Sequence, residues 1–285
     1  MSRAECRARA CSCYAEAMPI DAERLTKMNN QYGRRSGFLS SIPVVVKNLL
    51  IINVLMWVAT MVLKSRGIVD LNDYLALHFW KGSDFFPTQF FTYMFMHDSS
   101  SLQGGLIHIF CNMFNLWMFG TLLERAFGYK RFLFYYIMCG LGAAFVQEVV
   151  WQLTWTNDFF ANISAGGTQI SSAEAEMLYK SGQLNHLLPQ FYNMMITVGA
   201  SGAVFGLLLA FGMTYPNMRM YIIPFPFPIK AKWMVIGYGA IELFLGVSHT
   251  MSSVAHYAHL GGMLFGIVIL LYWKKKGLLG RNQWQ

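Results

Sequence analysis

The chain has 285 residues, of which 55% are hydrophobic and only 13% are charged. An average soluble domain carries about 25% charged residues, so this composition is typical of a membrane protein and argues against soluble domains. The net charge is +8, but the Lys and Arg residues lie beside apolar segments, as topology signals do. We therefore expect contact with a lipid bilayer and no nucleic-acid partner.

The first region, residues 1–41, is expected to be a flexible cytoplasmic tail. It is polar, basic and aperiodic, and it lacks the apolar core of a signal peptide. Met28 is a plausible alternative start, so the sequence leaves open whether residues 1–27 are native.

Cysteine usage indicates neither a disulfide framework nor a metal site. The five cysteines, an odd number, are scattered between the N-terminal tail and the apolar segments. The three in the tail lack a His or a further Cys pair that would complete a metal site. We expect free thiols, no metal and no cofactor.

Six apolar segments follow the tail and form one expected membrane domain over residues 42–273. Spanning a bilayer takes roughly 20 residues, with about 17–25 tolerated. The segments are 42–63, 104–122, 131–152, 196–214, 232–248 and 253–273. The fifth is short and the second contains polar residues, but six crossings return the C-terminus to the side of the N-terminus. The expected fold is all-α, with six transmembrane helices and a basic cytoplasmic tail at 274–285.

The distribution of Lys and Arg predicts the orientation of these helices. Basic residues cluster at the N-terminal end of the first span and at every second connection after it. The opposite loops, 64–103 and 153–195, contain few basic residues and half of the acidic ones. The positive-inside rule therefore places both termini in the cytoplasm.

Polar side chains occur on three of the expected spans. The second span carries His108 and Asn112, which are four residues apart and share a helix face. The fourth carries Ser201, and the sixth carries His256 and His259. At a rise of about 1.5 Å per residue, most of these groups lie roughly 5–12 Å below the outer surface. Polar groups within spans are costly and usually functional, so this convergence indicates a site.

Each of these polar groups, taken alone, has an ordinary explanation. A single Ser in a span usually bonds its own helix backbone or aids packing, and a single His or Asn usually links neighbouring helices. Glu148 and Glu242 also lie within the expected spans. Neither forms a recognisable constellation in the sequence, so we assign them no role.

Paired glycines accompany the Ser and the His. Gly202 and Gly206 are four residues apart on the fourth span, and Gly262 and Gly266 repeat that spacing on the sixth. Small residues at this spacing let membrane helices approach closely. Close approach is what a Ser hydroxyl needs to reach an imidazole at about 2.6–3.2 Å.

Three motifs resemble those of the rhomboid family of intramembrane serine proteases. They are His108-Ile109-Phe110-Cys111-Asn112, Gly199-Ala200-Ser201-Gly202 and Ala258-His259-Leu260-Gly261-Gly262 with Gly266. Gly-x-Ser-Gly alone is a weak signal, but all three motifs in order on the second, fourth and sixth spans are a strong one. The resemblance covers roughly residues 42–273 and implies the rhomboid-like, six-span fold of the bacterial type.

The resemblance implies a role for each of these residues. Ser201 would be the nucleophile and His259 its general base and acid. His108 and Asn112 would form the oxyanion hole with the backbone N–H of Ser201. Phe205 would pack on the catalytic His, where some members have a Tyr that can also donate a hydrogen bond. No Asp follows the base in a triad-like position, which indicates a Ser-His dyad.

The expected function is that of a serine endopeptidase which cleaves membrane-anchored proteins within or near a transmembrane helix. The expected location is a bacterial inner membrane. The alternative is a catalytically inactive relative that binds membrane clients, although such proteins usually lack the Ser or the His. A transporter would show internal repeats and a metalloprotease a His-Glu-x-x-His motif, and the sequence has neither. It leaves the substrate, the cut site and the oligomeric state open.

Overall fold

A computed structural model describes residues 38–165, 170–221, 227–248 and 256–279. The chain divides into two compact units, Met1–Ser41 and Ile42–Gln285. In the first unit only the short helix α3 (Phe38–Ser41) is described, so the expected flexibility of the tail falls almost entirely outside the described residues. The end of the basic tail, residues 280–285, also lies outside them.

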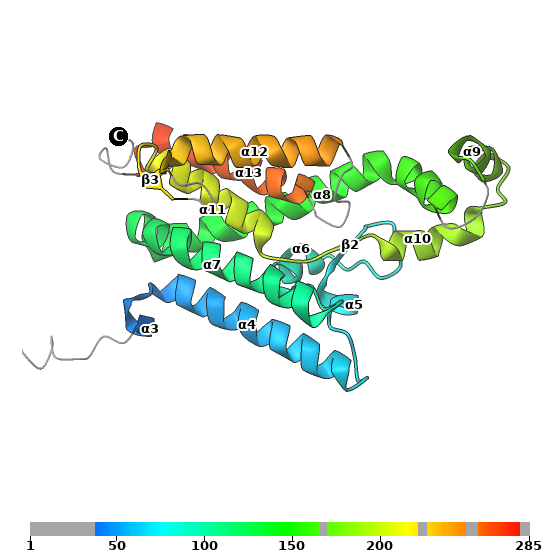
Figure 1. The fold of residues 1–285 in the computed structure, drawn as a ribbon, viewed down its shortest axis with the longest axis horizontal. Helices are drawn as coiled ribbons and strands as arrows, with labels where there is room; N and C mark the ends of the chain where they lie inside the picture. The colour runs from blue at the N-terminus through cyan, green and yellow to red at the C-terminus, as the bar shows by residue number, and fades with distance from the viewer. Residues whose placement is uncertain (1–37, 166–169, 222–226, 249–255, 280–285) are drawn as a thin grey trace, which may run out of the picture. The chain divides into compact units, whose positions relative to one another are not determined.

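The second unit is mostly helical, which confirms the expected all-α class (Figure 1). Its main helices are α4 (Val44–Ser65), α7 (Leu102–Phe127), α8 (Tyr129–Ala165), α11 (Ser201–Thr214), α12 (Ala231–Val247) and α13 (His256–Lys275). Among the described residues, α4, α7, α8 and α13 are long and apolar enough to cross a membrane, while α11 is apolar but shorter. The count of six spans therefore stays a prediction.

Helix α11 lies at the centre of this unit. It contacts α7, α8, α12 and α13, while α13 also packs along α8, and α4 packs against α7. Ten of the 14 residues of α11 are buried. A helix enclosed by others in this way is expected to be apolar around its whole circumference. The side chains of Leu207 and Phe211 are fully buried at its centre.

Glycines allow α11 and α13 to approach with their backbones nearly in contact. A side chain on Gly262 would collide with the backbone of Gly202, and one on Gly206 would lie 3.1 Å from the carbonyl oxygen of Gly262. A side chain on Gly266 would collide with the hydroxyl group of Tyr135 on α8. These close approaches fix the distance between the helix that carries Ser201 and the helix that carries His259.

The fourth apolar segment becomes helical later than predicted. The expected span began at residue 196, but Ile196–Thr197 forms strand β2, which pairs antiparallel with β1 (Leu77–His78). β-Branched residues favour an extended backbone, and the short ladder satisfies its polar groups. As a result Ser201 is the first residue of α11 and not a residue within it. A second two-stranded sheet joins β3 (Arg219–Met220) to β4 (Ile229–Lys230).

The loop predicted at 153–195 is largely helical. Helix α8 continues to Ala165, far beyond the expected span end at 152, and is followed by α9 (Ser172–Lys180), the 3-10 turn η2 (Asn185–Leu187) and α10 (Leu188–Met194). Figure 1 shows α10 beside the end of α8. The reason is an aromatic stripe at helical spacing, Trp151, Trp155 and Phe159, which packs in a small separate core with Phe79 and Phe191.

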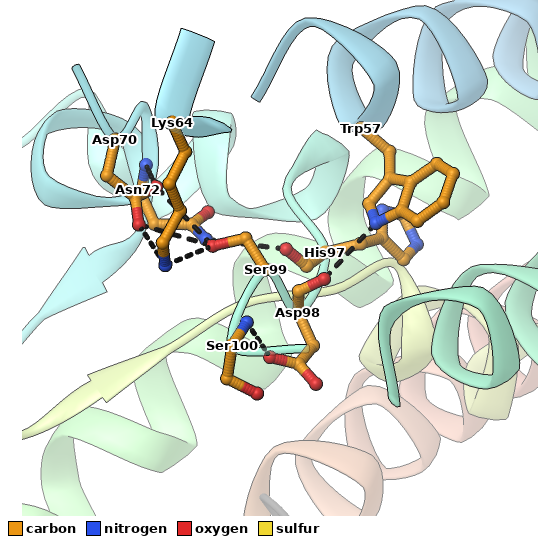
Figure 2. A network of polar contacts seen from close by, with 8 residues as sticks. All are labelled: Trp57, Lys64, Asp70, Asn72, His97, Asp98, Ser99 and Ser100. Carbon is orange, nitrogen blue, oxygen red and sulfur yellow. Dashed lines mark hydrogen bonds and ion pairs between the residues drawn. The ribbon is translucent and has the colours of Figure 1, made fainter. Parts of the chain in front are cut away.

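Polar contacts order the segment between α4 and α7, which includes α5 (Asn72–Leu75), α6 (Gln89–Thr92) and the 3-10 turn η1 (Tyr93–Phe95). Figure 2 shows the network. Lys64 forms an ion pair with Asp70 at 2.7 Å, and Asn72 Nδ2 donates to Ser99 Oγ at 2.8 Å. Burial raises the pKa of Asp70, but hydrogen bonds from Lys64 and the backbone of Asn72 outweigh it and lower the pKa overall. The network holds residues 97–100 at the start of α7.

Candidate active site

A glycine in an unusual conformation precedes Ser201. Gly199 has φ +127°, a region that residues with side chains rarely adopt. A side chain there would also lie 2.9 Å from Nε2 of His108. Gly199 donates its backbone N–H to the carbonyl of Tyr93 at 3.0 Å, which anchors the turn. Glycine is therefore required at this position for two reasons, its backbone conformation and the close approach of His108.

The turn after Gly199 starts α11 and presents Ser201. The first intrahelical bond runs from Val204 N to Ala200 O at 3.0 Å. The first N–H groups of a helix, Ser201 among them, have no acceptor within the helix and point toward any anion at its end. The nucleophile candidate therefore sits at a helix N-terminus that favours negative charge.

Ser201 and His259 are within hydrogen-bond distance although they are far apart in sequence. His259 Nε2 lies 2.8 Å from Ser201 Oγ. The ring of Phe205 stacks on the imidazole, with centroids 4.2 Å apart and planes 7° from parallel. His259 is buried, with 8% of its surface exposed. A Ser hydroxyl placed against a buried imidazole in this way is the arrangement of an activated nucleophile.

His108 and Asn112 line the same cavity from α7. The Nδ1 atom of His108 faces the backbone N–H of Asp98 at 3.3 Å and accepts from it. A neutral imidazole with Nδ1 as acceptor carries its proton on Nε2, the atom that lies beside Gly199 in the cavity that Ser201 also lines. Asn112 donates one amide hydrogen to His108 O at 3.1 Å, and its second hydrogen is available to another acceptor.

A second imidazole, His97, lies next to His108 in the segment before α7. The two ring centroids are 5.1 Å apart. Burial, together with the neighbouring His108, lowers the pKa of His97 to about 3. His97 is therefore neutral at ordinary pH, and it places an uncharged ring behind His108.

These residues surround a cavity of about 620 Å³. That volume is within the range of roughly 300–1,000 Å³ usual for ligand sites. Ser201, His259, His108, Asn112 and Phe205 all line it, as do Ile196, Thr197 and Val198. All four residues predicted to act in catalysis or oxyanion binding thus border one cavity. One wall of this cavity includes strand β2 (Ile196–Thr197), whose backbone is extended.

Sequence reasoning assigned no role to Glu242, yet its carboxylate contacts the base of the site. Its Oε2 atom on α12 lies 3.0 Å from Nδ1 of His259 and 2.7 Å from Nδ1 of His256. Two features of the sequence could have indicated this contact. They are an acidic residue inside an apolar segment and two His residues that are three positions apart. Among the described residues, these three also form the one group whose ligand atoms, all within 4.8 Å of one another, suit a metal ion.

Fold and site together define a polytopic, all-α membrane protein with a partly buried Ser–His pair in a cavity lined by polar and apolar side chains. The Rhomboid domain family matches residues 85–276, more than half of the chain. The chain belongs to the rhomboid family and is a multi-pass membrane protein. The predicted family is therefore confirmed.

Curated relatives are similar over more than half of the chain. RHOMBOID-like protein 4 of Arabidopsis thaliana is 26% identical over 175 residues, which are 60% of this chain and 32% of that protein. RHOMBOID-like protein 2 of the same plant is 27% identical over 59% of this chain and 38% of its own length. RHOMBOID-like protein 6, mitochondrial, is 25% identical over 59% and 39%. The chain thus spans 32% to 39% of the length of these relatives.

Proposed function

We propose that this chain is an intramembrane serine endopeptidase that hydrolyses peptide bonds of membrane-anchored proteins. The observation that carries the proposal is the 2.8 Å contact between Ser201 Oγ and His259 Nε2 inside a cavity that also receives His108 and Asn112. Family membership is consistent with proteolysis and also with an inactive client-binding protein. The retained Ser–His contact favours the protease.

The chemistry follows from the positions of these groups. His259 takes the proton of Ser201 as Oγ attacks the scissile carbonyl, and it returns that proton to the leaving amine. The oxyanion of the tetrahedral intermediate receives hydrogen bonds from the Ser201 backbone N–H, His108 Nε2 and Asn112 Nδ2. Water then attacks the acyl group, again with His259 as base, and releases the carboxylate product.

The substrate class follows from the surroundings of the cavity. Helices that suit a bilayer line it, so the substrate expected at Ser201 is a peptide of a membrane-anchored protein. A transmembrane helix satisfies its backbone groups internally, so the bond to be cut must first unwind. The extended segment Ile196–Val198 in the cavity wall offers unwound backbone a partner of matching geometry.

The distribution of basic residues, which predicts the topology, also supports a proposal for the location of the protein. The basic residues at alternate helix ends favour cytoplasmic termini, with six crossings between them and Ser201 near the outer face. The resemblance to compact six-span bacterial proteins favours a bacterial inner membrane. The partners are then transmembrane protein substrates and the bilayer itself.

Cleavage by purified protein tests the proposed function. The assay is hydrolysis of a single-span reporter protein in detergent or liposomes, with Ser201→Ala as the matched variant. We expect wild-type protein to cut the reporter at a defined bond and Ser201→Ala to leave it intact while unfolding at the same temperature. Cleavage by pure, folded Ser201→Ala would remove the proposal.

A further inference from the structure

We propose that Glu242 is a positioning residue for His259, a carboxylate that orients the base of the Ser-His pair from the far side of its ring. This inference rests on the proposed function. The carboxylate would keep the proton of His259 on Nδ1, hold the ring toward Ser201 and stabilise the imidazolium that forms when Ser201 is deprotonated.

The three groups lie in the required order. Ser201 Oγ is 2.8 Å from Nε2 of His259, and Glu242 Oε2 is 3.0 Å from Nδ1 on the other side of the ring. A carboxylate can only accept a hydrogen bond, so its position favours a proton on the nitrogen that faces it. The other nitrogen then has a free lone pair, and that nitrogen faces the Ser hydroxyl. The tautomer set by Glu242 is the one that a general base needs.

Other contacts hold Glu242 in place. His256 Nδ1 donates to the same Oε2 atom at 2.7 Å, and His256 and His259 lie three residues apart on one face of α13. The hydroxyl of Tyr257 donates to Gly246 O at 2.9 Å and so ties α12 to α13 beside the carboxylate. Only 12% of the Glu242 side chain is exposed. A buried carboxylate is costly unless it is paired, and in the described part of the chain Glu242 pairs with two histidines of α13.

The two histidines differ in how they meet the carboxylate. The contact of His256 is an aligned hydrogen bond. The contact of His259 is short enough, but its direction is not that of a hydrogen bond, and within the described part of the chain Nδ1 has no other partner. Catalytic hydrogen bonds are often poorly aligned before substrate binds. We expect this one to align when the ring becomes charged, since the attraction then strengthens.

A bound metal ion explains the same cluster less well. Zinc ligands lie about 2.0–2.2 Å from the ion in a tetrahedron, which sets neighbouring ligand atoms roughly 3.3 Å apart. The carboxylate oxygen is closer than that to both nitrogens, at 2.7 and 3.0 Å. Those distances are typical of direct hydrogen bonds. Metal binding at Nδ1 of His259 would also displace the proton that the proposed mechanism needs there.

The test compares Glu242→Gln with Glu242→Asp and with a matched control, Glu148→Gln. Gln keeps the size of Glu242 but removes the charge, while Asp keeps the charge at a shorter reach. Glu148 is a buried carboxylate on α8 that accepts from Trp80 N at 3.0 Å, a bond that a Gln oxygen can also accept. The readouts are kcat and KM for the reporter protein, the rate at which a fluorophosphonate labels Ser201, and the unfolding temperature.

We expect Glu242→Gln to lower kcat and the labelling rate by about 10²- to 10⁴-fold while KM stays similar, because the base loses its orientation and not its substrate. Glu242→Asp should retain at least about tenfold more activity than Glu242→Gln, and Glu148→Gln should stay within about threefold of wild type. A folded Glu242→Gln with wild-type kcat would overturn the proposal. If Ser201→Ala is inactive in the same assay, that result leaves the proposed function standing.

Two further arms keep the test decisive if Glu242→Gln does not fold. The ¹⁵N spectrum of wild-type protein labelled at histidine should show His259 protonated at Nδ1 and bare at Nε2. The opposite tautomer would contradict the role of Glu242. Wild-type activity should also survive a metal chelator, and a loss that added Zn²⁺ restores would make the cluster a metal site instead.

Discussion

Two histidines line the cavity that contains Ser201, and the groups behind them give them opposite chemistry. Behind His259, the carboxylate of Glu242 lies 3.0 Å from Nδ1. Behind His108, the backbone N–H of Asp98 lies 3.3 Å from Nδ1. An acceptor at Nδ1 favours the tautomer with a bare Nε2, and a donor at Nδ1 favours the tautomer with a protonated Nε2.

This difference shows that a histidine can serve as a base or as an oxyanion donor, depending on the group that contacts its Nδ1 atom. The two partners also come from different parts of the fold. Glu242 is supplied by one helix to another, so its position depends on how α12 packs on α13. Asp98 belongs to a loop, and its carbonyl is held by Trp57 Nε1 at 3.1 Å (Figure 2). Substitutions behind His259 and substitutions behind His108 should therefore impair the protein in different ways.

Removing the proposed base should have the largest effect. We expect His259→Ala to lower kcat by about 10⁴- to 10⁶-fold, because loss of the base costs as much as loss of the nucleophile in comparable proteases. His256→Ala should be far milder, since His256 acts only through Glu242. Cleavage kinetics of both variants decide the matter, and an active His259→Ala beside an inactive His256→Ala would reverse the assignment.

Removing an oxyanion donor should have a smaller and different effect. We expect His108→Ala and Asn112→Ala each to lower kcat by about 10²- to 10³-fold with little change in KM, because they contact charge that develops only during reaction. Steady-state kinetics in detergent separate the two constants. A large rise in KM at unchanged kcat would mean that these side chains bind substrate.

A substitution that forces α11 and α13 apart should displace His259 by disrupting the packing of the two helices. A side chain at Gly262 would collide with the backbone of Gly202, so we expect Gly262→Ala to destabilise the protein by about 1–3 kcal/mol. The displaced His259 should lower activity by about 10²-fold. Gly237→Ala on α12 is the control, because a side chain there meets no described atom within 4 Å. Thermal unfolding and cleavage are measured for both, and equal behaviour would refute the packing account.

Weakening the loop that carries Asp98 should have the smallest effect. The lowered pKa of Asp70 means that its contribution to stability is present above the ordinary value of 3.8 and is lost as the pH falls through the lower folded value. We expect Asp70→Asn to cost less than about 1 kcal/mol at neutral pH, because the ion pair with Lys64 is partly exposed. Unfolding measured against pH should show the two proteins converging in acid, and a gap that persisted there would contradict this.

Local patterns were enough to predict the family, the helical class and the residues around the cavity. Ser201, His259, His108 and Asn112 could be identified because each belongs to a short, contiguous motif that resembles those of the rhomboid family. Glu242 could not, since its contact with His259 depends on the rotation of α12 against α13, which no spacing encodes.

Segment ends were predicted less well than segment identities. The helical part of residues 153–195 was missed because its buried face consists of widely spaced aromatic residues within a polar sequence. The start of α11 was placed too early because Ile196–Val198 is apolar enough to extend the span. Its pairing with Leu77–His78 joins segments more than 100 residues apart, which hydropathy alone does not reveal.

Covalent labelling tests the central claim, an activated Ser201, most directly. A fluorophosphonate reacts with a Ser hydroxyl only when a base and an oxyanion site activate it. Mass spectrometry of labelled wild-type protein should locate one adduct on Ser201, and loss of reporter cleavage should follow the labelled fraction. Fully labelled protein that still cut the reporter, or an adduct that formed equally well in His259→Ala, would contradict the account.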